Sequence, residues 1–226
     1  HEGEYMIQSR YERLVNNLND YTYHILGCGA IGSSAAMQLV RTGGNKFILY
    51  DMDKVGLENV GVSQYDIEDV GETKVKALTK HLLAINDRTD VQECPWYFDF
   101  FRYQDNNDIV ILGFDSMKSR LEAVENICSN KQTKPYLMID GRMGAEHYQQ
   151  YVFTDVTLNN YKKTWYSDKD GDPEPCNAKA TSYCSNMAGS FIVNAVRKVV
   201  CQHPYETFLT FNFPTMTIEK KTCIPA

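Results

Sequence analysis

Short runs of apolar residues alternate along the chain with longer segments in which apolar residues recur every three or four positions. This alternation predicts strands and helices in turn, as in an α/β protein. The expected strands are Tyr21–Leu26, Lys46–Tyr50, Val91–Cys94, Asp108–Gly113 and Tyr136–Asp140. The expected helices are Tyr5–Leu18, Ile31–Thr42, Gly71–Asn86, Ser116–Ser129 and Ser185–Gln202. Because Asp108–Gly113 is apolar at successive positions, it suits a parallel strand buried on both faces.

The pattern changes in the last third of the chain. Tyr148–Phe153 and Thr207–Phe213 resemble strands, and Thr215–Glu219 can pair with the second of them as a hairpin. A long polar segment, residues 159–183, lies between them, and such a segment in a compact domain usually serves a function. The helix that follows is rich in small residues, which suits close packing. We expect a sheet with a parallel first half, a mixed or antiparallel second half and helices on both faces.

Three glycines follow the first predicted strand. Gly27, Gly29 and Gly32 form G-x-G-x-x-G around Ala30, immediately before a helix. Only glycine allows so tight a turn and so close an approach to a phosphate, and the helix that follows points its free N–H groups at the anion. Asp51 ends the next strand, where a carboxylate can accept bonds from ribose hydroxyls. These features predict a Rossmann-like nucleotide-binding sheet.

Further polar residues follow at positions suited to a nucleoside triphosphate. The loop after the second strand carries Asp53, Asn59 and Gln64, and Lys74 lies in the first turn of the next helix. A lysine there suits the neutralisation of phosphates better than the binding of a nicotinamide ring. Asp115 follows a buried strand, where its carboxylate can hold Mg²⁺ beside a triphosphate.

Composition excludes several classes of function. The 226 residues carry a net charge of −6 with no run of Lys or Arg, which argues against a nucleic-acid surface. No apolar stretch approaches the ~20 residues of a membrane span, and the polar first residues do not resemble a signal peptide. We expect a cytoplasmic protein with one domain. Seven cysteines without a C-x-x-C pair predict neither a disulfide framework nor a zinc site.

The order and spacing of several motifs are specific as a set. They are GCGAIGS, DMDKVGLEN, VGETKVKAL, ILGFDSMKSR and PCNAKATSYCSNMAGSFIVNAVRK. On these motifs the whole chain resembles the ThiF/MoeB/HesA/E1-like adenylyltransferase family, as a minimal, zinc-free, bacterial or phage-type member. The resemblance implies ATP-dependent activation, with Mg²⁺, of the C-terminal carboxylate of a ubiquitin-like or sulfur-carrier protein or peptide ending in Gly-Gly. The products would be an acyl-adenylate and pyrophosphate.

The resemblance also implies roles for single residues. The glycine loop would hold the phosphates and Asp51 the ribose, while Asn59 and Lys74 would contact the phosphates. Asp115 would bind Mg²⁺. Arg13, in a Tyr-x-Arg pattern, would reach the ATP of a second subunit, which implies a homodimer.

A cysteine before the last long helix accepts the acyl group in some members of the family. Cys176 lies at that position, and a thiolate within reach of an adenylate would form a thioester. Cys184 is the rival nucleophile, but its place at the start of a helix favours packing. On this reading residues 1–226 form one adenylation domain, with an N-terminal helix (1–20), a nucleotide-binding half (21–141) and a substrate half (142–226).

One departure from the family concerns a loop arginine. The family usually carries Asn-x-x-Arg-Gln after the acidic loop, whereas this chain has Val62 or Ser63 where the arginine belongs, and Gln64 is displaced by one. Arg142, just past a predicted strand end at the same sheet edge, is our hypothesis for a substitute. The aromatic run 96–103 suits a core or dimer-contact segment rather than a surface for stacking nucleic-acid bases.

Two other functions remain open from the sequence. An NAD(P)-dependent oxidoreductase would use the same glycine loop, although no convincing hydride-transfer residues accompany it. A non-catalytic E1-like ATP-binding module would keep the fold without the loop arginine.

Overall fold

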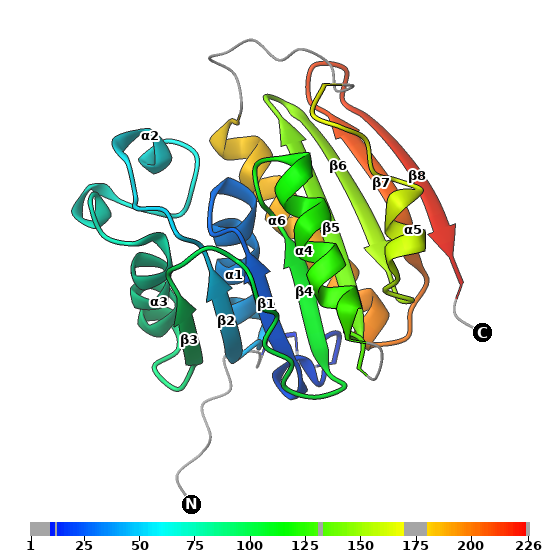
Figure 1. The fold of residues 1–226 in the computed structure, drawn as a ribbon, viewed down its shortest axis with the longest axis horizontal. Helices are drawn as coiled ribbons and strands as arrows, with labels where there is room; N and C mark the ends of the chain where they lie inside the picture. Colours follow the sequence, from blue (N-terminus) through cyan, green and yellow to red (C-terminus); the bar gives the residue numbers. More distant parts are fainter. Residues whose placement is uncertain (1–9, 12, 131–132, 170–179, 225–226) are drawn as a thin grey trace, which may run out of the picture.

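An eight-stranded sheet in the order β3-β2-β1-β4-β5-β6-β7-β8 forms the centre of the computed structural model, which describes residues 10–11, 13–130, 133–169 and 180–224 (Figure 1). The parallel strands are β1 (Thr22–Leu26), β2 (Lys46–Tyr50), β3 (Asp90–Cys94), β4 (Asp108–Leu112) and β5 (Leu137–Gly144). The antiparallel strands that follow are β6 (His147–Phe153), β7 (Tyr205–Asn212) and β8 (Thr217–Cys223). The division into a parallel and an antiparallel half confirms the fold class expected from the sequence.

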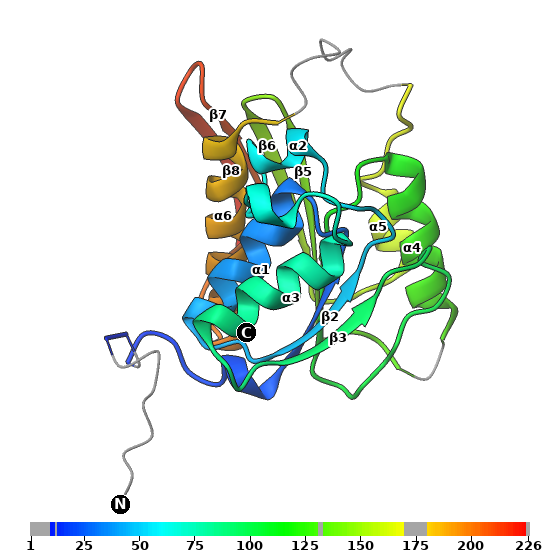
Figure 2. The same cartoon turned by 90° about the vertical axis from the view of Figure 1, so that its left-hand side faces the viewer.

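Helices cover both faces of the sheet (Figure 2). On one face lie α1 (Ala30–Thr42), α3 (Lys74–Ile85) and α6 (Ser182–Val200), and on the other lie α4 (Met117–Ser129) and α5 (Leu158–Lys162). Because successive side chains of a strand point to opposite faces, Ile25 packs in the first layer and Leu26 in the second. The remaining short helices are η1 (Leu18–Asp20), α2 (Leu57–Val60) and η2 (Ile67–Asp69).

Close packing of α1 against α6 depends on small side chains. A Cβ atom added at Gly189 of α6 would lie 2.2 Å from Oγ of Ser34 on α1. The small residues seen in the sequence of the last long helix therefore permit the contact that joins the two halves of the chain.

The expected N-terminal helix is wrong in the part that the structure describes. Residues 10–11 and 13–17 lie in turns, a bend and irregular backbone, and of the described residues only η1 follows before β1. Asn17 adopts a left-handed conformation, with φ of 63°, which interrupts a helix, and Val15 and Leu18 reach the core without one. Residues 5–9 of the predicted helix lie outside the described residues.

Two loops contain more regular structure than expected. The segment between β2 and α3 holds α2 and η2, and the polar segment 159–183 begins within α5. The helix expected from Gly71 starts at Lys74, because Gly71 itself has a φ of 94°. This later start places Lys74 at the N-terminus of α3.

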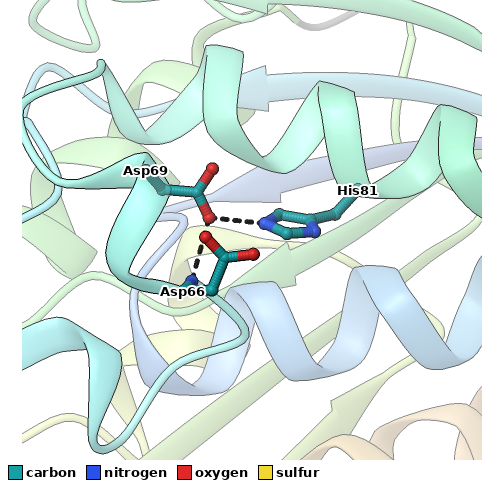
Figure 3. Close-up of side chains that lie close together, drawn as sticks. All are labelled: Asp66, Asp69 and His81. Carbon is teal, nitrogen blue, oxygen red and sulfur yellow. Dashed lines mark hydrogen bonds and ion pairs between the residues drawn. The ribbon is translucent and has the colours of Figure 1, made fainter.

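A buried aspartate fixes the loop before α3 to that helix. Asp69 is 1% exposed, and its Oδ2 accepts a bond from the backbone N–H of Asp66 (2.9 Å) and lies 2.5 Å from Nε2 of His81 (Figure 3). Its Oδ1 accepts from Nζ of Lys80 at 3.1 Å. Lys80 and His81 both belong to α3, so the cluster joins the loop to the helix that carries Lys74.

The Asp69 cluster predicts a pH-dependent contribution to stability. Burial would raise the pKa of Asp69, but its bonds from Asp66, His81 and Lys80 outweigh burial and lower it. A lowered pKa contributes stability above the unfolded value of about 3.9, and that stability is lost as the pH falls through the folded value. We expect Asp69→Asn to cost about 2 kcal/mol in urea unfolding at pH 7 and much less near pH 2.

Asp87→Asn is the matched control for this prediction, because Asp87 is exposed just beyond the other end of α3. An equal loss of unfolding free energy at both pH values would contradict the electrostatic explanation.

The helices that the structure describes include none long and apolar enough to span a membrane.

Candidate nucleotide site

Two adjoining cavities lie at the carboxyl edge of the parallel strands. They have volumes of about 220 Å³ and about 630 Å³. The residues that line both are Gly29, Lys74, Gly113, Phe114 and Asp115. These residues follow β1, begin α3 or follow β4, so the site arises because parallel strands end at one edge of the sheet.

The three glycines of the turn after β1 have two different roles. A Cβ at Gly27, whose φ is 90°, would lie 2.8 Å from the carbonyl oxygen of Gly113, and one at Gly32 would lie 1.9 Å from that of Gly27. These two glycines therefore allow the turn and the helix to pack. Gly29 has no atom within 4 Å of such a Cβ and faces both cavities. Its missing side chain leaves space for a ligand.

Asp51 joins the glycine turn to the end of β2. Its Oδ2 accepts from the backbone N–H of Cys28 at 2.7 Å, and its Oδ1 accepts from that of Asp53 at 2.9 Å. Burial raises the pKa of Asp51, although nearby Lys74 and these two bonds oppose the rise. The carboxylate lines the smaller cavity, as expected from the sequence.

Lys74 supplies a buried positive charge between the two cavities. Its Nζ lies 3.0 Å from Oδ2 of Asp53, and the residue is 7% exposed. Burial alone would lower the pKa of Lys74, but Asp51, Asp53 and then Asp115 outweigh it and raise the pKa. The ammonium is therefore charged at neutral pH and can meet an anion from either cavity.

The larger cavity has a second buried cation. Arg120, on α4, is 4% exposed, lines this cavity, and donates from Nη1 to the carbonyl oxygen of Leu112 and to Asp140. Asn59 lines the same cavity, and its Oδ1 accepts from the backbone N–H of Gly56 at 2.8 Å. Asn59, Lys74, Asp115 and Arg120 thus border one space, as a site for a triphosphate requires.

Aromatic side chains form the outer wall of the smaller cavity. Trp96, Tyr97 and Phe98 line it together with Phe114, while Phe101 is buried in the core. The expectation that the run 96–103 serves as core or dimer contact is thus correct for Phe101, but it did not include the lining of the cavity by Trp96, Tyr97 and Phe98. The signal available in the sequence was an aromatic run between β3 and β4 without the periodicity of a helix.

Two residues expected at the site lie elsewhere. Gln64 lines neither cavity, and its Nε2 donates to Oδ1 of Asn186 at 2.8 Å, which fixes the loop to α6. Arg142 also lines neither; it donates to Oδ2 of Asp140 through Nε (2.9 Å) and Nη2 (2.7 Å) and lies over the ring of Tyr151. The hypothesis that Arg142 replaces the loop arginine does not agree with this placement.

Arg13 is exposed at the opposite edge of the molecule. Tyr11 in the same turn donates to the carbonyl oxygen of Arg41, in the last turn of α1, whereas Gly29 precedes the first turn of that helix. The 13 residues of α1 separate these ends by about 20 Å. Arg13 is therefore remote from the cavities of its own chain.

The buried cysteines among the described residues suit packing rather than catalysis. Cys28 and Cys184 are buried, and burial raises the pKa of Cys184 to about 11, with Glu146 adding to the effect. Burial and then Asp51 also raise the pKa of Cys28. The expectation that Cys184 is packed is confirmed. Cys176, the predicted acyl acceptor, lies outside the described residues.

The combination of a glycine turn, a carboxylate after β2 and a buried lysine at one sheet edge agrees with the motifs found in the sequence. The model of the ThiF family matches residues 2–225. The chain belongs to the ThiF family.

Curated relatives share part of this sequence. Ubiquitin-like modifier-activating enzyme 5 of Oryza sativa subsp. japonica is 39% identical over 159 residues, covering 70% of this chain and 33% of the relative. The protein of the same name from Arabidopsis thaliana is 25% identical over 166 residues, with the same shares of the two chains. This ThiF-family chain thus spans about a third of the length of the curated relatives it matches.

Solved structures with the same fold cover nearly the whole chain. E. coli MccB with ATP has a TM-score of 0.69 at 17% identity and covers 92% of this chain and 65% of MccB. PaaA has a TM-score of 0.66 at 17% identity, with the same coverage. At this identity the likeness establishes the fold alone.

Proposed function

We propose that this ThiF-family chain is an ATP-dependent adenylyltransferase that activates the C-terminal carboxylate of a protein or peptide. The observation that carries the proposal is Lys74, a buried and charged lysine that borders two adjoining cavities, both of which Asp115 also lines. A nicotinamide enzyme needs no such cation beside its glycine turn, which is why we favour ATP over NAD(P).

Each part of the site suits one part of ATP. The base fits the smaller cavity against the aromatic wall, and the ribose hydroxyls fit Asp51. The triphosphate passes Gly29 and Lys74 into the larger cavity, toward Asn59. Asp115 offers carboxylate oxygens at the cavity, the donor type that Mg²⁺ prefers, and the ion would neutralise charge on the phosphates.

The reaction follows from these positions. An oxygen of the substrate carboxylate attacks the α-phosphorus of ATP, a P–O bond forms, and the bond to pyrophosphate breaks with the electron pair leaving on the pyrophosphate. The residues of this chain align the reactants and neutralise charge rather than bond covalently to them. We assign the role of the absent loop arginine to Arg120, because Arg120 borders the triphosphate space and Arg142 does not.

The carboxylate substrate is best sought among ubiquitin-like or sulfur-carrier proteins and peptides ending in Gly-Gly. Relatives of this chain are named as activators of ubiquitin-like modifiers, and MccB has been crystallised with AMPCPP and MccA. We expect Mg·ATP to raise the melting temperature and to exchange pyrophosphate once such a substrate is supplied. Stabilisation by NAD⁺ or NADPH instead would point to an oxidoreductase, and Mg·ATP binding without exchange would point to a non-catalytic module.

We further propose that two copies of the chain act together. Arg13 is too remote to reach the cavity of its own chain, so a role at the triphosphate requires a second subunit. Arg13→Ala and Lys74→Ala should each be inactive alone. Co-refolded mixtures should regain about a quarter of the wild-type activity, since half the dimers are mixed and each has one complete site. No recovery in a mixture shown to contain mixed dimers would contradict the proposal.

We also propose that the thiolate of Cys176 attacks the acyl carbon of the adenylate, so that a thioester forms and the bond to AMP breaks with AMP as the leaving group. Ala180 lines the larger cavity, and the four Cα–Cα steps from Cys176 to Ala180 span at most about 14 Å. Cys176→Ala should abolish a thiol-sensitive adduct with the substrate while pyrophosphate exchange continues. Cys201→Ala, at the far end of α6, is the control. An adduct that persists in Cys176→Ala would exclude this cysteine.

A further inference from the structure

The wall of the smaller cavity is formed by a segment without regular structure. Residues 95–107 connect β3 to β4 and form neither helix nor strand, yet Trp96, Tyr97 and Phe98 line the cavity from this segment. Figure 1 shows the connection crossing the sheet beside α4. Because no backbone ladder holds such a segment, its position depends on side chains that bind its N–H groups.

Asn126 of α4 accepts one such bond, from the backbone N–H of Phe101 at 2.9 Å. Two more go to a group of three buried polar side chains that bond to one another. His24 of β1 lies with Nε2 at 2.7 Å from Oδ1 of Asp108 and with Nδ1 at 3.1 Å from the hydroxyl of Tyr50. His24 and Asp108 are fully buried, and Tyr50 is 2% exposed. Polar groups at such depth are costly unless they are all bonded, so the three residues form a rigid unit.

Both ends of this unit hold the irregular segment. The hydroxyl of Tyr50 accepts from the backbone N–H of Arg102 at 3.3 Å, and Oδ2 of Asp108 accepts from that of Gln104 at 3.0 Å. The ring of His24 also lies 4.4 Å from that of Phe101. His24 is the only one of the three that bonds to both of the others, so it sets their relative positions.

Two ring contacts link the buried residues and the segment to the cavity wall. The guanidinium of Arg102 lies 5.5 Å from the ring centre of Trp96, and the ring of Tyr50 meets that of Phe98 edge-on at 5.1 Å. Trp96 and Phe98 both line the cavity, whereas His24 does not. Tyr50 lines the cavity as well, so a change at His24 can reach the cavity through Tyr50 directly and through the segment.

We infer that His24 is a positioning residue for the nucleotide site: through Tyr50 and Asp108 it holds the 96–104 segment so that Trp96 and Phe98 form the wall against which the base binds. The part that concerns the base rests on the proposed function. The part that concerns the position of the wall does not.

Comparing the affinities for two ligands, one with a base and one without, separates the contribution of the base from that of the phosphates. His24→Phe keeps a ring beside Phe101 and removes both ring nitrogens, so it should weaken Mg·ATP about tenfold and change the Kd of Mg·tripolyphosphate less than about twofold. His24→Gln keeps one donor and one acceptor and should restore most of the affinity for ATP. Tyr103→Phe is the matched control, since it removes another bond of the segment, to the carbonyl oxygen of Ile127, on the side of α4. Equal losses for both ligands, or no loss, would overturn the inference.

A second readout needs no nucleotide. The chain has two tryptophans, so subtraction of the Trp96→Phe protein isolates the fluorescence of Trp96. Its quenching by acrylamide should change in His24→Phe and return toward wild type in His24→Gln, and unchanged quenching would overturn the inference. If the wild-type protein bound no Mg·ATP, the proposed function would fail while this measurement still decided the position of the wall.

Hydrogen exchange tests the network in the wild-type protein and covers the case in which His24→Phe does not fold. The amides of Arg102 and Gln104 should exchange at least about a hundredfold more slowly than in an unstructured peptide, because their acceptors are buried side chains. Exchange of both amides at the unstructured rate would show that the network does not hold the segment and would overturn the inference.

Discussion

Lys74→Ala should lower substrate-dependent pyrophosphate exchange by about a hundredfold to a thousandfold, the range found when one preorganised charge is removed from a transition state. Lys74 is buried, charged, and positioned by Asp53 between the two cavities. Its loss would leave Asp51, Asp53 and Asp115 facing the triphosphate without the nearest cation. Affinity for Mg·ATP should fall as well, whereas the fold should persist because Asp53 is half exposed.

The same helix offers a matched control for this prediction. Lys76→Ala removes the same charge two residues further along α3, where the side chain is 65% exposed and pairs with Glu72 at 2.7 Å. It should leave exchange within about twofold of wild type, as expected for a surface ion pair. Equal losses in the two variants would show that net charge rather than the site is responsible, and undiminished exchange in Lys74→Ala would refute the assigned role.

Alanine substitutions at two nearby glycines should have different effects, one on the unfolding free energy and the other on the affinity for Mg·ATP. Gly32→Ala should destabilise the protein by about 3 kcal/mol, because its Cβ would lie 1.9 Å from a backbone oxygen that cannot move without the turn. Gly29→Ala should leave the unfolding free energy nearly unchanged, because the new methyl meets no atom within 4 Å. The methyl would instead occupy the space of the phosphates and weaken Mg·ATP about tenfold or more.

Urea unfolding and calorimetric titration with Mg·ATP distinguish the two effects. Gly61→Ala is the control, since its Cβ also meets nothing within 4 Å and Gly61 lines neither cavity. It should change neither quantity. If Gly29→Ala bound Mg·ATP as tightly as Gly61→Ala, the phosphates would not pass Gly29 and the assignment of the cavity would be wrong.

The position of Arg142 away from both cavities has a specific structural cause. The sequence pattern ended the strand at Asp140, which placed Arg142 beyond the edge of the sheet. In the structure β5 continues to Gly144, because the antiparallel partner β6 pairs Arg142 with Gln149. Arg142 is thereby held two residues along the same strand from Asp140, on the same face, and its guanidinium binds that carboxylate instead of a ligand.

The described part of the predicted N-terminal helix is not helical, again because a local pattern does not determine tertiary contacts. Apolar spacing in a short segment is compatible with a helix, but most helical stability in proteins comes from packing. Of the residues described in this segment, Val15 and Leu18 are buried in the core and Tyr11 packs against it, and Asn17 turns the chain toward β1. Local pattern therefore overestimated the regular structure before the sheet and underestimated it in the loop that contains α2 and η2.

The sequence by itself determined the α/β architecture and the positions of Gly29, Asp51, Lys74 and Asp115 at one edge, because these follow from strand periodicity and from the rule that parallel strands end together. Only the tertiary structure decided that Arg120 borders the larger cavity and that an irregular aromatic segment closes the smaller one. Both depend on contacts between residues far apart in the chain, such as His24 with Asp108, which no local pattern encodes.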